Sequence, residues 1–179
     1  GVVVHSGDET GRIAPGMRVA CGGVGFANHA EQVSVPLLLS PVVPDGVAPE
    51  SAAYATVGAI AMQGIRQAAV QLGETVAVIG LGLVGLLAVQ LLKAAGCRVV
   101  GVDPSEPARR RAVAAGADLV APPENALDAA MAASSARGVD AVIICAATPS
   151  SSPVELAGKI ARSRGRVVIS SKIRPCHGS

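Results

Sequence analysis

Aromatic side chains are nearly absent from this chain of 179 residues, which has one tyrosine, one phenylalanine and no tryptophan. This shortage argues against a platform for stacking nucleic-acid bases and against an aromatic carbohydrate groove. The formal net charge is +2, so no global electrostatic argument favours nucleic acid, and we expect no nucleic-acid partner. Half of the residues are apolar and 16% are charged, which excludes a disordered polyelectrolyte.

Metal-site spacings are also missing. The four cysteines, Cys21, Cys97, Cys145 and Cys176, form no CxxC pair, and three histidines cannot supply a zinc-finger spacing. We interpret the cysteines as small buried or incidental thiols, and we expect a cytoplasmic protein. No signal-peptide layout follows Gly1. Because Val2–Val4 resemble the middle of a strand, we expect the chain to begin within a larger protein.

One uncharged run, from Thr75 to Leu92, reaches the lower length limit of a membrane-spanning helix. Its first part, Val76 to Ile79, is typical of a strand, and three glycines then interrupt it. A buried strand, a glycine turn and a helix explain the run better than a membrane span, so we expect no membrane partner.

From Gly73 onward, candidate strands and helices alternate, whereas the first 45 residues read as short strands and turns, among them Gly1–His5, Arg18–Ala20 and Gln32–Val35. Gly96, Gly116, Gly138 and Gly165 each follow a predicted helix. The pattern predicts an α/β fold with a doubly wound parallel sheet whose strands are apolar throughout. The expected strands are Thr75–Ile79, Arg98–Val102, Leu119–Ala121, Ala141–Cys145 and Arg166–Ile169. The expected helices are Leu83–Ala95, Glu106–Ala115, Ala126–Ala136 and Pro153–Ser163, after a helical region that begins at Pro49.

The most informative motif is the run GLGLVG at residues 80–85, which follows a strand and opens a helix. Gly80 would permit the tight turn, Gly82 would let the backbone approach a pyrophosphate, and Gly85 would let the helix pack closely. Leu83 and Val84 lie at the helix start, whose N–H groups favour phosphate. Asp103, 18 residues past the last glycine, can accept hydrogen bonds from ribose hydroxyls. A purely structural turn is the alternative.

Asp103 also bears on which dinucleotide would bind. A carboxylate there repels the additional phosphate of NADP, so NAD is favoured. Arg109, Arg110 and Arg111 lie in the next helix, and one of them could tolerate that phosphate. A solvated helix face is the other interpretation of these arginines.

At this point the sequence resembles the medium-chain dehydrogenase/reductases, the zinc alcohol dehydrogenase-like superfamily. The resemblance runs from Gly1 to about Ile169 and rests on the order and spacing of many short pieces. They include PGMRV at 15–19, HAE at 29–31, VPDGV at 43–47, GETVAVIG at 73–80, GAD at 116–118 and GVD at 138–140. Residues 58–68 are similar to a bi-domain subgroup, in which a second oxidoreductase domain like that of glucose–fructose oxidoreductase follows.

The resemblance implies a division of the chain. Residues 1–48 would be the tail of a GroES-like catalytic β domain, 49–72 connecting helices, 73–171 the Rossmann domain and 172–179 an irregular tail. The loop after the fourth strand, with Cys145, Ala146 and Ala147, would lie against the cofactor.

Departures from the family pattern concern zinc. No four-cysteine lobe follows Cys21, and the expected third catalytic ligand has no counterpart near Ala55 and Thr56. Catalytic zinc needs three protein ligands, so we predict no zinc. His29 alone is a tempting ligand, but a lone histidine in a turn is more typical of a structural role. After Ile169 the family usually continues through a sixth strand, and this chain does not match it.

The sequence therefore favours a zinc-independent oxidoreductase that transfers hydride between NAD(H) and an alcohol or carbonyl substrate. A non-catalytic NAD-binding module and a zinc-dependent alcohol dehydrogenase are the alternatives. No catalytic residue can be assigned. The association state has two alternatives. Two copies of the chain could pair through the edge of the sheet as a homodimer, or an exposed edge could cause the chain to aggregate.

Overall fold

The structure is a computed structural model that describes residues 1–170, and Cys176 and the predicted tail lie outside the described residues. The chain divides into two compact units, Gly1–Thr56 and Val57–Ser179. The boundary falls inside the stretch expected to connect two domains. Among the described residues, no helix has the length and apolarity that crossing a membrane requires.

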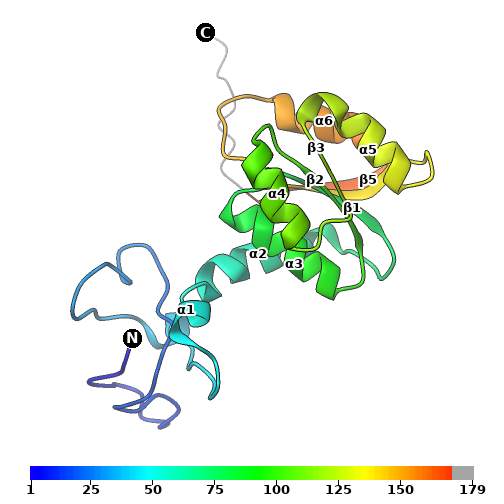
Figure 1. Cartoon of the computed structure of the whole chain (residues 1–179). Helices are drawn as coiled ribbons and strands as arrows, with labels where there is room; N and C mark the ends of the chain where they lie inside the picture. The colour runs from blue at the N-terminus through cyan, green and yellow to red at the C-terminus, as the bar shows by residue number, and fades with distance from the viewer. Residues whose placement is uncertain (171–179) are drawn as a thin grey trace. The chain divides into compact units, whose positions relative to one another are not determined.

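The second unit is a five-stranded parallel sheet with the order β3-β2-β1-β4-β5 (Figure 1). Consecutive strands are joined through helices, which is the connection that parallel pairing requires. The doubly wound α/β fold is confirmed. The strands are β1 (Thr75–Ile79), β2 (Arg98–Val102), β3 (Leu119–Ala121), β4 (Val139–Ile144) and β5 (Ala161–Ile169).

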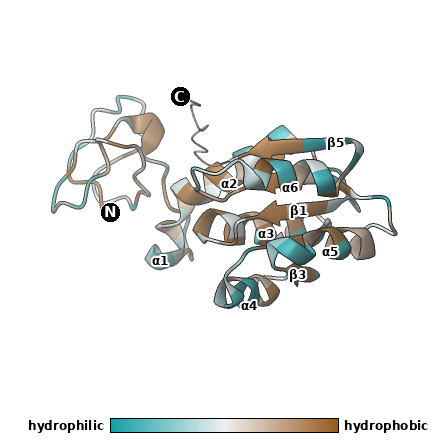
Figure 2. Ribbon diagram, turned by 90° about the horizontal axis from the view of Figure 1, so that it is seen from above, coloured by the Kyte–Doolittle hydropathy of each residue, from teal (hydrophilic) through white to brown (hydrophobic). Residues whose placement is uncertain are grey.

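Helices cover both faces of this sheet (Figure 1). Small residues of α2, α3 and α4 pack on one face with Val76, Val78 and Ile143, and small residues of α5 and α6 pack on the other with Ile79, Val102 and Ile144. The strands are accordingly among the most apolar parts of the chain (Figure 2). The helices are α2 (Ala55–Ala68), α3 (Leu83–Ala94), α4 (Glu106–Ala114), α5 (Ala126–Ala133) and α6 (Ser152–Ile160), and the short 3-10 helix η2 (Pro123–Asn125) precedes α5.

The run from Thr75 to Leu92 forms a strand, a turn and a helix, as predicted. All five residues of β1 are buried, which explains why this stretch carries no charge. Glycines at positive φ end two of the helices that follow, at Gly96 (φ 76°) and Gly116 (φ 103°).

Two predicted helices, α5 and α6, end three residues earlier than expected. Helix α5 stops at Ala133, because the buried Ser134 hydroxyl donates to the Ala130 carbonyl (2.7 Å) and accepts from the N–H of Gly138 (2.9 Å). Helix α6 stops at Ile160, because residues from Ala161 onward belong to β5. The prediction that Gly165 caps a helix is therefore wrong.

The edge strand β5 also differs from the prediction of strands buried throughout. Val167 and Ile169 are 43% and 51% exposed, because β5 has a partner strand on one side only among the described residues. Four residues, 162–165, stand opposite the single residue Asp140, which makes a pronounced bulge.

The first unit holds little regular structure. Its strand-like pieces make two isolated antiparallel bridges, Val2 with Arg18 and Val19 with Val42. The prediction of a strand at Gln32–Val35 is wrong, since this segment pairs with no described strand. Helices η1 (Leu37–Leu39) and α1 (Pro49–Ala52) complete the unit, and Pro49 occupies the first position of α1, as its fixed φ favours.

Asp140, near the start of β4, links this strand to β1 and β5 by hydrogen bonds. Its carboxylate accepts hydrogen bonds from the N–H of Thr75 in β1 (2.8 Å) and from Arg162 in β5 (2.7 Å). Burial raises the pKa of Asp140, but the hydrogen bonds from Arg162 and Thr75 outweigh it and hold the pKa below its ordinary value. The ionised carboxylate therefore stabilises the folded state.

We expect this contribution to be present at neutral pH and lost on acidification. It is complete above the unfolded pKa of about 3.9 and disappears as the pH falls through the lower, folded-state pKa. Urea midpoints measured between pH 7 and pH 2 should fall more steeply for the natural chain than for Asp140→Asn. The control is Asp128→Asn, since Asp128 is exposed on α5 and its side chain makes no hydrogen bond to the described residues. A slope that is unchanged in Asp140→Asn would contradict the assignment.

Candidate functional site

The glycine turn lies at the carboxyl end of β1, between that strand and α3. Gly80 has φ of 93°, and its N–H donates to the Val102 carbonyl of β2 (2.8 Å). A Cβ added to Gly80 would lie 2.5 Å from the backbone nitrogen of Ala146. Both the backbone conformation and the close neighbour therefore require glycine.

Gly85 and Gly82 differ in what surrounds them. A Cβ at Gly85 would lie 1.9 Å from the carbonyl oxygen of Gly80, so the absence of a side chain lets α3 start directly against the turn. A Cβ at Gly82 would meet no atom within 4 Å. Gly85 thus has the packing role predicted for it, while Gly82 faces open space of the kind that a phosphate would need.

The first turn of α3 is free of a capping side chain. Gly82 is the N-cap residue and makes no side-chain cap hydrogen bond, and the first turn contains no acidic residue. The N–H groups of this turn, which include those of Leu83, Val84 and Gly85, have no acceptor within the helix. Leu83 is half exposed, and Val84 packs partly against the core. The arrangement fits an anionic ligand at the helix start.

Asp103 is tied to the glycine turn. Its Oδ2 accepts a hydrogen bond from the N–H of Leu81 (2.8 Å), and its Oδ1 accepts one from the N–H of Ser105 (2.8 Å). A carboxylate offers about four acceptor positions, so both oxygens retain capacity for a ligand's hydroxyl groups. The structure brings the predicted glycines and Asp103 into one site.

Arg109 lies beside the same turn. Its Nη1 donates to the backbone carbonyls of Asp103 (2.6 Å) and Pro104 (2.8 Å), which holds this half-buried residue against the backbone of the turn. Arg110 instead pairs with Glu106 along α4, and Arg111 is exposed. Of the three arginines, Arg109 is the one that the structure joins to the Asp103 turn.

The loop after β4 forms the floor under the glycine turn. The N–H of Cys145 donates to the Ile79 carbonyl of β1 (2.7 Å), and Cys145 and Ala146 lie against Gly85 and Gly80 respectively. Burial raises the pKa of the Cys145 thiol to about 11. The thiol is therefore neutral at physiological pH and acts as a packing group rather than a nucleophile. Ala147 is exposed at the same edge.

Two residues that contribute to this site, Leu81 and Gly101, were not predicted. The backbone N–H of Leu81 donates to the Asp103 carboxylate and so links the glycine turn to Asp103. The buried Leu81 side chain occupies the space that Gly101 leaves open. A Cβ at Gly101 would lie 3.1 Å from the Leu81 side chain. The sequence signal for this contact was Gly101 itself, because a glycine among the valines of strand Arg98–Val102 often marks a place where another group approaches closely.

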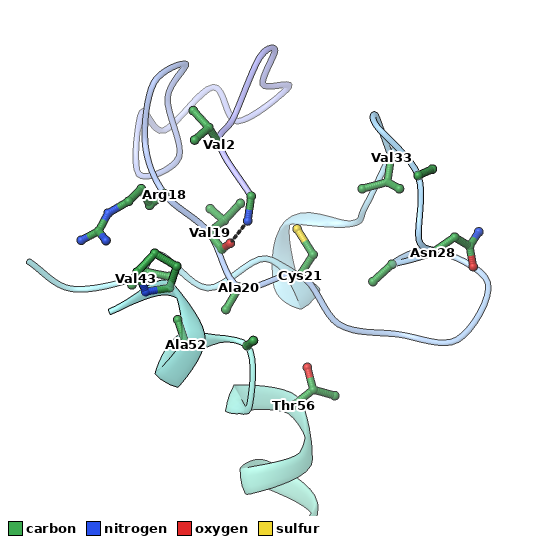
Figure 3. A pocket seen from close by; sticks show the side chains of 15 residues that line it. Val2, Arg18, Val19, Ala20, Cys21, Asn28, Val33, Val43, Ala52 and Thr56 are labelled. Carbon is green, nitrogen blue, oxygen red and sulfur yellow. Dashed lines mark hydrogen bonds between the residues drawn. The ribbon is translucent and has the colours of Figure 1, made fainter. Parts of the chain in front are cut away.

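A separate cavity of about 470 Å³ lies within the first unit. Figure 3 shows the side chains of Cys21, Asn28 and Thr56 around it, together with Arg18 and several apolar groups. His29 is exposed and does not line it. Within residues 1–170, no three His, Cys, Asp or Glu side chains come together in a way that could hold a metal ion. The described donor set therefore does not fit a three-ligand zinc site, and the absence of zinc stays a prediction.

Comparison with known proteins identifies the family. The family model described as zinc-binding dehydrogenase matches residues 84–175, about half of the chain. This chain belongs to that dehydrogenase family. The resemblance to the medium-chain dehydrogenase/reductases is thereby confirmed, whereas the similarity to the bi-domain subgroup stays a prediction.

Individual relatives agree with this assignment. Alcohol dehydrogenase 1 of Emericella nidulans is 34% identical over 81% of this chain and 40% of the relative. A proposed zinc-binding dehydrogenase of Sinorhizobium meliloti, bound to NADP, superposes with a TM-score of 0.82 at 25% identity, over 99% of this chain and 60% of the other. For 2R,3R-butanediol dehydrogenase of Bacillus subtilis the TM-score is 0.78 at 26% identity, and the match covers 98% of this chain and 57% of the other. The chain spans 40–60% of these three relatives.

Proposed function

We propose that this chain binds a nicotinamide dinucleotide for an oxidoreductase that transfers hydride between the nicotinamide and an alcohol or carbonyl group. The observation that carries the proposal is the glycine turn at the start of α3, with open space at Gly82 and the Asp103 carboxylate hydrogen-bonded to the same turn. A dehydrogenase family and a relative that is bound to NADP support it. The bound dinucleotide would supply the hydride chemistry.

The chain's own groups would then bind and orient the dinucleotide. The N–H groups at the start of α3 would donate to its phosphates, where the partial positive charge of the helix end also acts. The Asp103 carboxylate would accept from the hydroxyls of a ribose. The floor formed by Cys145 and Ala146 would exclude water from beneath the turn, since it contacts Gly80 and Gly85 directly.

We propose NAD rather than NADP as the dinucleotide. The negative charge of Asp103 would repel a phosphate on the ribose hydroxyl that it contacts. Arg109 is the opposing influence, because its guanidinium is hydrogen-bonded to the backbone carbonyl of Asp103 and could pair with the additional phosphate. The carboxylate is the stronger of the two influences, since Arg109 Nη1 already donates its hydrogen bonds to the backbone carbonyls of Asp103 and Pro104.

Calorimetric titration of the chain with NADH and, separately, NADPH tests the proposal. We expect saturable binding of both, with NADH at least about tenfold tighter, which corresponds to about 1.4 kcal/mol. Tighter binding of NADPH would overturn the choice of NAD and would assign Arg109 to the phosphate. No heat from either, from chain shown to be folded by circular dichroism, would overturn dinucleotide binding.

We propose that hydride transfer is independent of zinc, because positions 55 and 56, where the resemblance to the family implies a zinc ligand, hold Ala55 and Thr56. A chain that binds NADH and does not oxidise it with carbonyl compounds would instead be the dinucleotide-binding module considered above. Zinc that copurifies at one equivalent and is needed for turnover would favour the zinc-dependent alternative.

A further inference from the structure

A second polar cleft, of about 370 Å³, lies at the amino ends of the strands. Its lining includes Thr75 at the start of β1, Arg98 at the start of β2 and Arg137 just before β4. Because the strands are parallel, this edge of the sheet is the one opposite the glycine turn. The cleft is thus a separate place from the candidate dinucleotide site.

The lining carries an excess of positive charge. The charged residues of the lining are Lys93, Arg98 and Arg137 on the positive side and Asp118 on the negative side. Asp118 is already compensated, because both of its oxygens accept from the Lys93 ammonium (2.9 and 2.8 Å) and Oδ2 also accepts from the N–H of Val99 (2.7 Å). Asp140 also lies within electrostatic reach of Arg137, but it is ion-paired with Arg162 (2.7 Å), so the two arginines remain in excess of these carboxylates.

The carbonyl ends of α3 and α5 also reach this edge, and each carries about half a negative charge. They offset about one of the two excess positive charges. About one positive charge is therefore left in the cleft.

The two guanidinium groups are held in place by the turn that follows α5. Arg98 Nη1 donates to the Ala133 carbonyl (2.9 Å), and Arg137 Nε donates to the Ser134 carbonyl (3.3 Å). A guanidinium has five N–H donors, and each of these uses one on the described residues. The remaining N–H donors are available to a ligand, because both arginines are exposed. Because both side chains are already anchored, less conformational entropy is lost when a ligand binds.

We propose that this cleft binds the phosphate group of a small molecule, with Arg98 and Arg137 as its hydrogen-bond donors. Two planar guanidinium forks match the oxygen atoms of a phosphate, and charge-assisted bonds of this kind are the strong ones. The cleft is larger than a single phosphate ion, so it leaves room for the organic part of a phosphate ester. This site goes beyond the proposed dehydrogenase function and does not depend on it.

The probe for the test is inorganic phosphate, titrated calorimetrically into the intact chain at an ionic strength kept constant with sodium chloride. We expect saturable binding whose dissociation constant rises at least about tenfold in Arg98→Gln and in Arg137→Gln. The matched control is Arg111→Gln, since Arg111 is exposed on α4 and its side chain makes no hydrogen bond to the described residues. Its affinity should equal that of the natural chain.

Arg98→Lys retains the positive charge without the paired N–H donors of the guanidinium, and it should bind phosphate with intermediate affinity. Circular dichroism verifies that each variant is folded. Phosphate at the glycine turn would be weakened by Gly82→Ala and unaffected by the arginine substitutions, and that outcome overturns the proposal. So does the absence of saturable binding by the natural chain.

Discussion

Replacing Gly85 with alanine is expected to lower the free energy of unfolding by about 3 kcal/mol, near the upper end of overpacking effects. The new Cβ would lie 1.9 Å from the Gly80 carbonyl oxygen and 3.0 Å from its carbon. Both are backbone atoms of a turn held on β2 by the Gly80 N–H, so no flexible side chain can move aside. Urea denaturation followed by circular dichroism measures the effect.

Gly82→Ala is the matched control for this prediction. Gly82 has φ of −72°, which alanine adopts readily, and a Cβ there meets no atom within 4 Å. We expect stability within about 1 kcal/mol of the natural chain. NADH affinity should nevertheless fall at least about tenfold, because the methyl group occupies the space proposed for a phosphate. Unchanged NADH affinity in Gly82→Ala would mean that Gly82 is not at the phosphates, and a stable Gly85→Ala would contradict the packing argument.

Substitution of Asp103 has the second largest expected effect, on cofactor affinity and on cofactor preference together. In Asp103→Ala, the N–H groups of Leu81 and Ser105 lose their acceptor, and the proposed ribose contact disappears. We expect the dissociation constant for NADH to rise at least about tenfold, with a much smaller change for NADPH. Calorimetric titration with both dinucleotides measures the two effects.

Asp103→Asn separates charge from hydrogen bonding. The amide keeps one oxygen acceptor for the turn and removes the negative charge that would repel the additional phosphate. We therefore expect the ratio of NADPH to NADH affinity to rise relative to the natural chain. Asp128→Asn removes a charge from an exposed position on α5 and should leave the ratio unchanged. An unchanged ratio in Asp103→Asn would show that the carboxylate does not discriminate between the dinucleotides.

The sequence by itself determined the architecture of the second unit. Strands β1, β2 and β3 have the predicted bounds, since uninterrupted branched and apolar residues can be buried on both faces only inside a helix-covered sheet. Helices α3 and α4 begin where predicted, and each ends one residue early. The glycine turn was visible as well, because its three glycines are close neighbours in the chain and directly follow a predicted strand.

What the sequence could not supply are particular side-chain hydrogen bonds and the pairing of distant segments. The ends of α5 and α6, the bulge at residues 162–165 and the exposed face of β5 depend on Ser134, on Asp140 and on the order of the strands. Local propensity favours a longer helix in both places. At the end of α5 the hydrogen bonds of the Ser134 hydroxyl to Ala130 and Gly138 outweigh it, and at the end of α6 the pairing of β5 with β4 does so. In the first unit, the few strand-like residues found little to pair with among the described residues, so their propensity did not become a sheet.

The same division holds for the two candidate sites. The sequence pointed to the glycines and Asp103 of the proposed dinucleotide site. The tertiary structure decided that Asp103 holds the turn through Leu81 and that Arg109 alone of the three arginines reaches it. The cleft of Arg98 and Arg137 had no sequence signature at all. These arginines are 39 positions apart, and only parallel strands that place their amino ends at one edge bring them together. Spacing along the chain records local turns, whereas the register of a sheet is set by the burial of every strand at once.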